Sequence, residues 1–218
     1  MSTTKKLVIA VVALSVAMCC MIGGTLAWLL AESNEVTNTF TVGNIEITLW
    51  ENNLKTDGTL GNEEVVKNDT YKVVPGATQP KNPTVTVKAN SENCYVYMKV
   101  TNNMVLKIDG QTVEVATYTV NTGWELIGEA TDANTGVKTY LYRFNAIQKL
   151  NAEDQDVTAL FNNITYAAEE ILLGNINELN GKTIVIQAYA HQSDNLSDTV
   201  ADEAAKDWAK VSDIPANQ

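Results

Sequence analysis

The segment GGTLAWLLAESNEVTNTFTVGNIEITL, residues 23–49, contains the boundary around which the chain is organised. Upstream of it, an almost unbroken apolar run begins at Leu7, directly after two lysines. Downstream, residues 36–49 begin a series of short segments in which apolar and polar side chains alternate, the period of a half-buried strand. The positive head, the apolar core and the small residues at Thr25 and Ala27 predict an export signal that is cleaved after Ala27.

The apolar run Leu7–Leu30 is long for a cleaved signal, because about 20 apolar residues suffice to cross a bilayer. An uncleaved anchor with its positive end inside is therefore the competing interpretation. Gly23 and Gly24 favour cleavage, since a glycine costs a helix about 1 kcal/mol relative to alanine and leaves the outer end open to a peptidase. The residues of the predicted cleavage site are Thr25, Leu26, Ala27 and Trp28.

Length and charge limit what the exported part can be. Removal of 27 of the 218 residues leaves 191, enough for one domain with a sizeable core. The formal charge of −11 becomes −13 when the two leading lysines are lost, which argues against nucleic acid or an anionic bilayer as a partner. Of three cysteines only Cys94 remains, so no internal disulfide can form. Its place at the start of an apolar strand predicts a buried thiol.

Most of the mature chain is predicted to form strands. Tyr95–Thr101 alternates between two kinds of side chain, and Asp109-Gly110 supplies the positive dihedral angles of a tight hairpin turn. Thr183–Ala190 is apolar on both faces, which predicts a central strand. Many short strands separated by polar turns predict a mainly β fold, an antiparallel β-sandwich of jelly-roll-like form.

Three segments depart from this pattern. Asn151–Asn163 has helical character, because Val157, Leu160 and Phe161 fall on one side. Glu169–Leu179 is open between a short helix and a covering loop. A C-terminal helix is predicted from about Asp198 to Val211. Its predicted capping pair is Thr199 and Asp202, and its predicted apolar stripe is Val200, Ala204, Trp208 and Val211.

The sequence therefore predicts four parts. Residues 1–27 form the signal peptide, and residues 28–43 form an N-terminal segment that can act as a donor strand. Residues 44–213 form the β-sandwich domain, and residues 214–218 form a flexible tail.

The residues do not form a recognisable catalytic or metal-binding motif. His191 is the only histidine, which removes the His-Glu-x-x-His motif of zinc proteases and the usual base for a nucleophile. The run from Asp132 to Gly136 resembles the start of a calcium loop, but Arg143 stands at the twelfth position, so a turn is favoured. We predict a protein that is not an enzyme and has no catalytic, cofactor-binding or metal site.

Residues 23–49 resemble the corresponding region of SipW-dependent exported proteins of Gram-positive bacteria, a class that includes TasA-, CalY- and camelysin-like proteins. The resemblance continues more weakly through Val73–Gly76, Pro83–Val87, Cys94–Val100 and Ala188–Ala190. It implies that a SipW-type signal peptidase removes the leader and that the protein is secreted to the cell surface or the extracellular biofilm matrix. The metalloprotease assignment of camelysin has no matching motif here.

In TasA-like fibres the mature N-terminal segment adds as a strand to the sheet of the next subunit. The residues that this resemblance implies for the assembly strand are Val36, Phe40 and Val42, and their apolar side chains are unfavourable on a free terminus. The competing interpretation places Phe40 and Val42 in the first strand of their own domain.

The predicted function is that of a secreted, non-enzymatic structural protein, with assembly into fibres by N-terminal strand addition. The alternative is a monomeric surface adhesin or glycan-binding module, with Trp50 and Trp124 stacking on sugars, although tryptophans in a sandwich more often pack in the core. The expected partners are the signal peptidase and other copies of the chain. No nucleic acid is expected, and the membrane is contacted only through the signal segment.

Overall fold

The computed structural model of the protein describes Lys5 and residues 44–66, 71–172 and 174–214. The chain divides into two compact units, Met1–Val42 and Gly43–Gln218, and the elements below all belong to the second. Within the described ranges, no helix has the length and apolarity of a membrane span.

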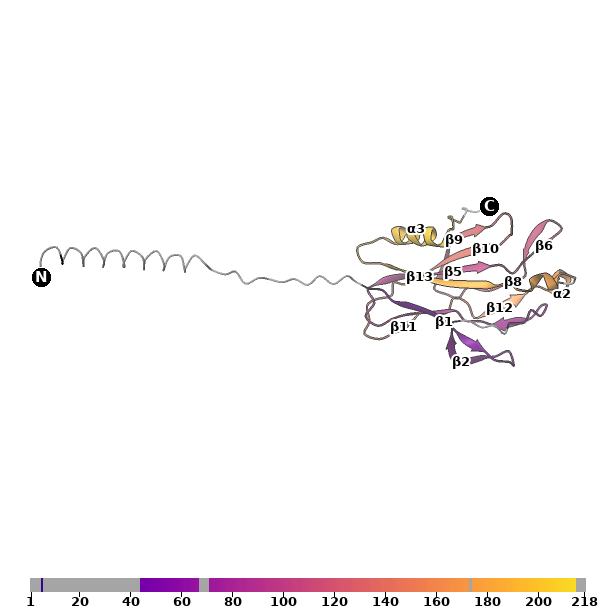
Figure 1. The fold of residues 1–218 in the computed structure, drawn as a ribbon, viewed down its shortest axis with the longest axis horizontal. Helices are drawn as coiled ribbons and strands as arrows, with labels where there is room; N and C mark the ends of the chain where they lie inside the picture. The colour runs from indigo at the N-terminus through magenta and orange to yellow at the C-terminus, as the bar shows by residue number, and fades with distance from the viewer. Residues whose placement is uncertain (1–4, 6–43, 67–70, 173, 215–218) are drawn as a thin grey trace. The chain divides into compact units, whose positions relative to one another are not determined.

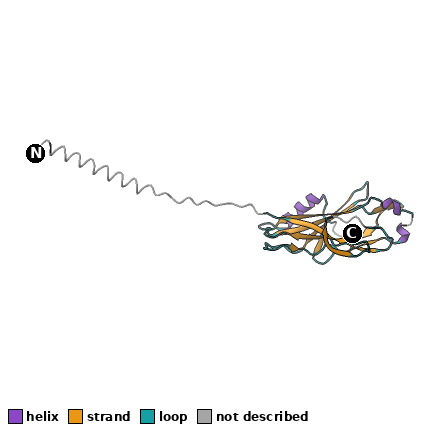
Figure 2. Ribbon diagram, turned by 60° about the horizontal axis from the view of Figure 1, so that its bottom comes forward, coloured by secondary structure: helices purple, strands orange, loops and turns teal. Residues whose placement is uncertain are grey.

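The second unit is mainly β and its sheets are antiparallel, so the predicted fold class is confirmed (Figures 1 and 2). Two four-stranded sheets have the orders β11-β4-β1-β2 and β13-β5-β10-β9, a third sheet has the order β3-β12-β8, and β6 pairs with β7. The elements are β1 (Ile47–Leu54), β2 (Leu60–Val65), β3 (Thr78–Pro80), β4 (Thr84–Val87), β5 (Cys94–Asn102), β6 (Val105–Ile108), β7 (Gln111–Glu114), β8 (Ala116–Thr117), β9 (Trp124–Thr131), β10 (Lys138–Phe144), β11 (Gln155–Asp156), β12 (Asn163–Tyr166), α2 (Glu169–Leu172), the 3-10 helix η1 (Ile176–Leu179), β13 (Ile184–Gln192) and α3 (Asp198–Ala209).

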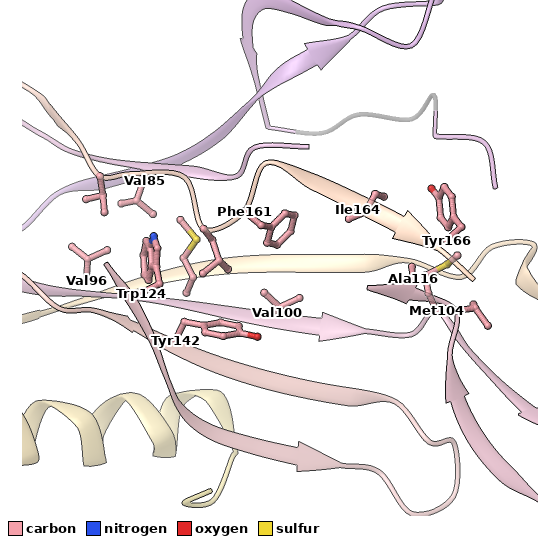
Figure 3. Close-up of a cluster of buried hydrophobic side chains, with 14 of the residues drawn as sticks. Val85, Val96, Val100, Met104, Ala116, Trp124, Tyr142, Phe161, Ile164 and Tyr166 are labelled. Atoms are coloured by element: carbon pink, nitrogen blue, oxygen red, sulfur yellow. The ribbon is translucent and has the colours of Figure 1, made fainter. Parts of the chain in front are cut away.

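The main core lies between the sheets that contain β4 and β5. On β5, Val96 and Met98 are fully buried and pack with Val85 of β4 in one apolar cluster. Figure 3 shows Val85, Trp124 and Phe161 between the ribbons of the two layers. Burial of each large aliphatic side chain stabilises the fold by about 1.5–3 kcal/mol. The arrangement is sandwich-like, while the jelly-roll connectivity stays a prediction.

The β6–β7 hairpin forms where Asp109-Gly110 predicts it. Ile108 pairs with Gln111, so Asp109 and Gly110 are the two turn residues. Their φ angles of 51° and 79° are both positive, as a type I′ turn requires.

The prediction of a central position for the last strand is wrong. Among the described residues, β5 is the only strand that pairs with β13, so β13 lies at the edge of its sheet. Both of its faces are apolar for another reason. Ile186 packs against the main core, whereas Tyr189 lies on the opposite face and packs in a second cluster with α3.

The prediction of helical character for Asn151–Asn163 is also wrong. The segment is extended, and β11 within it pairs with β4. The backbone N–H of Val157 donates to the carbonyl of Val85 at 2.8 Å, and that of Leu160 donates to Pro83 at 3.0 Å. Carbonyls of β4 and of Pro83 just before it accept these hydrogen bonds. The backbone N–H groups of the segment are therefore satisfied without the internal hydrogen bonds of a helix.

The segment from Glu169 to Leu179, left open by the sequence, contains two short helices, α2 and η1. Each buries one leucine, Leu172 from α2 and Leu179 from η1. The segment is therefore helical and also covers part of the core.

The C-terminal helix is confirmed and its predicted cap is wrong, while of its predicted stripe Trp208 and Val211 pack toward the sheet and Val200 does not. The N-cap is Ser197, whose hydroxyl accepts from the N–H of Val200, while Asp202 of the predicted pair bonds to the sheet instead. The helix residues that are buried against the sheet are Ala201, Ala205 and Ala209, and Trp208 stacks on Tyr189 beside them. Val200 is 48% exposed. The small alanines allow the helix to lie close to the bulky Tyr97 and Leu141, so the contact runs along the alanine row.

Candidate functional site

The residues predicted for cleavage and assembly lie outside the described residues. They are Thr25, Leu26, Ala27 and Trp28 for the first and Val36, Phe40 and Val42 for the second. Both assignments stay predictions.

The two residues considered for nucleophilic catalysis are not arranged as a pair. Cys94 points into the core, and burial raises the pKa of its thiol to about 11, so it stays protonated at neutral pH. His191 pairs in register with Tyr95 and therefore lies on the opposite face of the sheet. In the part of the chain that the structure describes, no three His, Cys, Asp or Glu side chains group in a way that could hold a metal ion.

The segment that begins at Asp132 forms the predicted turn. The carboxylate of Asp132 accepts from the backbone N–H groups of Asn134 at 2.9 Å and Thr135 at 2.8 Å. Hydrogen bonds from Thr135 and Asn134 hold the pKa of this carboxyl below its usual value. The Asp132 carboxylate thus stabilises the turn by accepting hydrogen bonds from its backbone.

The tryptophans considered for sugar binding are engaged in packing. Trp124 is buried, its Nε1 donates to the carbonyl of Thr158 at 2.7 Å, and its ring meets Phe144 edge-on at 5.2 Å between centroids. Trp50 is half-buried, and its Nε1 donates to the hydroxyl of Thr86 at 2.7 Å. Because the Trp124 ring is enclosed in this way, it cannot stack on a sugar.

Sequence reasoning missed a buried ion pair between Glu51 on β1 and Lys81. The Nζ of Lys81 lies 2.5 Å from the Glu51 carboxylate, and the same ammonium stands 4.9 Å from the centroid of the Tyr71 ring. The two charges compensate each other in a place from which water is largely excluded. Nothing in the local sequence indicates a pairing over 30 positions.

The outer edge of β13, with which no strand of the described ranges pairs, is the most distinctive feature of the domain. The N–H of Ser193 donates to the carbonyl of Asn93, and the N–H of Asn103 donates to that of Thr183. Bonded and non-bonded pairs alternate along an antiparallel ladder, and the register of β13 and β5 is unbroken. The residues whose backbone N–H and C=O groups point away from β5 are therefore Ile184, Ile186, Ala188, Ala190 and Gln192.

Aliphatic side chains beside this edge are incompletely covered. β1 approaches β13 but pairs only with β2 and β4 among the described strands (Figure 1). From the two strands and the entry to β1, side chains that pack against the main core remain partly exposed. We call this set the β1–β13 seam, and its members are Ile45, Ile47, Leu49, Ile184, Ile186, Ala188 and Ala190. An extended segment laid on β13 would pair with its free backbone groups and cover these side chains.

The outer face of the same sheet is closed by α3. Asp202 accepts from the hydroxyl of Tyr97 at 2.9 Å and lies 2.7 Å from Nη1 of Arg143. The other guanidinium nitrogen lies 3.1 Å from the Glu125 carboxylate. Burial and the bond to Asp202 raise the pKa of Tyr97, so its hydroxyl stays a donor. The helix is thus fastened to β5 and β10 and covers a face of the sheet, so it leaves the edge of β13 uncovered, while β9 at the other edge is bridged to Ser212 at Glu129.

Replacing Asp202 with alanine is expected to lower the free energy of unfolding by about 2 kcal/mol, because it leaves the largely buried Arg143 and Tyr97 without their shared acceptor. The measurement is urea unfolding followed by far-ultraviolet circular dichroism. Asp207→Ala is the matched control, since Asp207 lies on the same helix and its bond to Lys210 is exposed. Equal midpoints for the two variants would show that Asp202 does not fasten the helix.

The described domain thus offers a free strand edge over a partly covered aliphatic seam, and the residues considered for catalysis are kept apart. Comparison with protein-family models, with curated proteins and with solved structures gave no match for this chain.

Proposed function

We propose that this protein is a secreted structural protein of the cell surface or extracellular matrix, whose subunits assemble into fibres by N-terminal strand addition. The observation that carries the proposal is the free edge of β13 beside the β1–β13 seam. This edge is nine residues long, and its donors and acceptors pair with no other described strand and lie next to incompletely buried aliphatic side chains. A strand that pairs there satisfies the backbone and removes apolar surface from water.

The segment that precedes the domain has the composition that such an edge requires. Val36, Phe40 and Val42 are separated by even numbers of residues, so an extended chain places them on one face. In such an extended chain the threonines at 37, 39 and 41 would occupy the other face, and threonine favours extended structure. The apolar face suits the seam, and the threonine face suits solvent.

Export and release of this segment complete the proposal. A SipW-type signal peptidase would cut after Ala27, and the apolar leader of residues 7–30 would hold the chain at the membrane until then. The support for this step is the leader pattern and the resemblance of residues 23–49. Without the leader the chain is strongly acidic, which keeps free subunits soluble.

The protein secreted by its producing cell is expected to begin at Trp28 and to form fibres in negative-stain micrographs. Deletion of residues 28–40 is expected to abolish the fibres and leave a folded monomer, because the acceptor edge lies in the remaining domain. N-terminal sequencing, microscopy and sedimentation velocity measure these outcomes. A chain from Trp28 that stays monomeric at high concentration, and whose behaviour the deletion does not change, would contradict the proposal.

A monomeric adhesin or glycan-binding module is the competing function. It predicts glycan binding by a monomeric protein and loss of that binding in Trp50→Ala. The enclosed position of Trp124 removes one of the two rings on which that function depends.

A further inference from the structure

Three exposed aliphatic side chains lie at one end of the domain, around Asn93. The Asn93 side chain accepts from the N–H of Leu150 at 2.8 Å, and its carbonyl accepts from Ser193. Gln148 exchanges backbone bonds with Cys94, and the N–H of Leu196 bonds back to Ser193. These contacts gather the loops before β5, after β10 and after β13. We call this surface the Asn93 end, and its exposed apolar residues are Ile147, Leu150 and Leu196.

Asn44, which directly follows the N-terminal segment in the sequence, lies at this same end. The N–H of Glu92 donates to the carbonyl of Asn44 at 3.0 Å, which fixes Asn44 beside Asn93. An assembly strand that extends to Val42 is separated from Asn44 by Gly43 alone. One residue spans at most about 3.6 Å. The copy that receives the strand must therefore lie directly against the Asn93 end of the copy that donates it.

The direction in which the incoming strand pairs with β13 decides which end of the receiving copy the donating copy contacts. Antiparallel pairing is the more stable and the more common arrangement. In an antiparallel arrangement the last residue of the incoming strand, Val42, lies near the first residue of β13, Ile184. Ile184 pairs with Asn102, at the end of the domain opposite Asn93.

The opposite end carries an exposed aliphatic residue of its own. η1 is joined to the start of β13 by a short turn and contacts β6, and Ile176 of η1 is exposed. We call this surface the η1 end. Figure 1 shows β6 and α2 at this end of the sheets and the loop before α3 toward the other.

We propose that the Asn93 end of each subunit docks on the η1 end of the next copy of this chain, so that an apolar end-to-end contact accompanies strand addition. The inference rests on the proposed function and names the surface that joins the subunits. Two different surfaces meet, so the contact is heterologous and repeats along an open filament rather than closing a dimer. Burial of Ile147, Leu150 and Leu196 against a second copy removes them from water.

The test separates docking from strand addition. The full mature chain is dispersed to monomers, and two quantities are measured: the critical concentration for fibre growth and the affinity for a synthetic peptide of residues 28–43. The peptide fills the edge of β13 but brings no domain with it. The double variant Leu150→Glu/Leu196→Glu is expected to raise the critical concentration at least tenfold and to change the peptide affinity less than twofold.

Ile176→Glu, on the receiving surface, is expected to have the same effect. Val66→Glu is the control, because Val66 is 91% exposed and directly follows Val65 of β2, which pairs with Glu51 in the middle of β1. Peptide binding together with wild-type assembly of the double variant would overturn the docking surface and leave strand addition standing. Failure of the peptide to bind even the wild-type monomer would refute strand addition, and the docking inference with it.

Discussion

Ala188→Pro is expected to abolish fibre formation while the domain stays folded. The N–H of Ala188 points away from β5, so proline removes a donor from the free edge and none from the β5 ladder. Proline is tolerated on edge strands at such positions. Its ring also occupies space that an incoming strand would need. The measurement is the yield of fibres by sedimentation and microscopy.

Two variants make this result specific. Ala188→Val adds similar bulk but keeps the N–H, and it is expected to assemble. Gln187→Pro removes an N–H that points toward β5, so it is expected to destabilise the fold itself, shown by a lower urea midpoint. Normal fibres from Ala188→Pro would mean that β13 is not the acceptor edge.

Phe161→Ala is expected to cost about 3–5 kcal/mol of the free energy of unfolding, the usual range for removal of a fully buried aromatic side chain. The Phe161 side chain lies in the main core (Figure 3) and is inaccessible to solvent. Its ring stacks on that of Tyr118 at 4.3 Å between centroids. Its backbone forms a bridge with Val120, so the surrounding chain cannot easily collapse into the cavity.

Urea unfolding monitored by tryptophan fluorescence measures this cost, because Trp124 lies in the same core. Leu150→Ala serves as control, since Leu150 is 57% exposed and its truncation is expected to change the stability of the monomer by less than about 0.5 kcal/mol. A loss below about 1 kcal/mol for Phe161→Ala would show that the two layers are not tightly packed around it.

Local pattern was sufficient for part of this fold. The alternation in Tyr95–Thr101 and the pair Asp109-Gly110 predicted a strand and a turn correctly, because both are determined by neighbouring residues. Cys94 is buried as its apolar surroundings indicated. Local pattern was insufficient where the same residues fit two kinds of secondary structure. The spacing of Val157, Leu160 and Phe161 fits a helix, yet the backbone bonds to β4 decide for an extended chain.

The candidate site was harder to predict, because an edge is defined by which strands pair. Both faces of β13 are apolar in the sequence, and a helix that covers one face produces the same pattern as a central position. The row of alanines on α3 carried the missing signal. A stripe of small residues beside Trp208 indicates close packing on a flat partner such as a sheet. The cleavage and assembly residues precede the described domain and stay predictions.

The burial of Cys94 has a practical consequence for a chain trimmed after Ala27. No other sulfhydryl group remains in such a chain, so no disulfide has to form during refolding. Neither an oxidant nor a disulfide isomerase is required, and reducing agents leave the stability of the protein unchanged. The buried Cys94 thiol is also expected not to react with alkylating dyes under native conditions. Any cysteine introduced on the surface then becomes a unique attachment point for spectroscopic labels, in the otherwise unaltered protein.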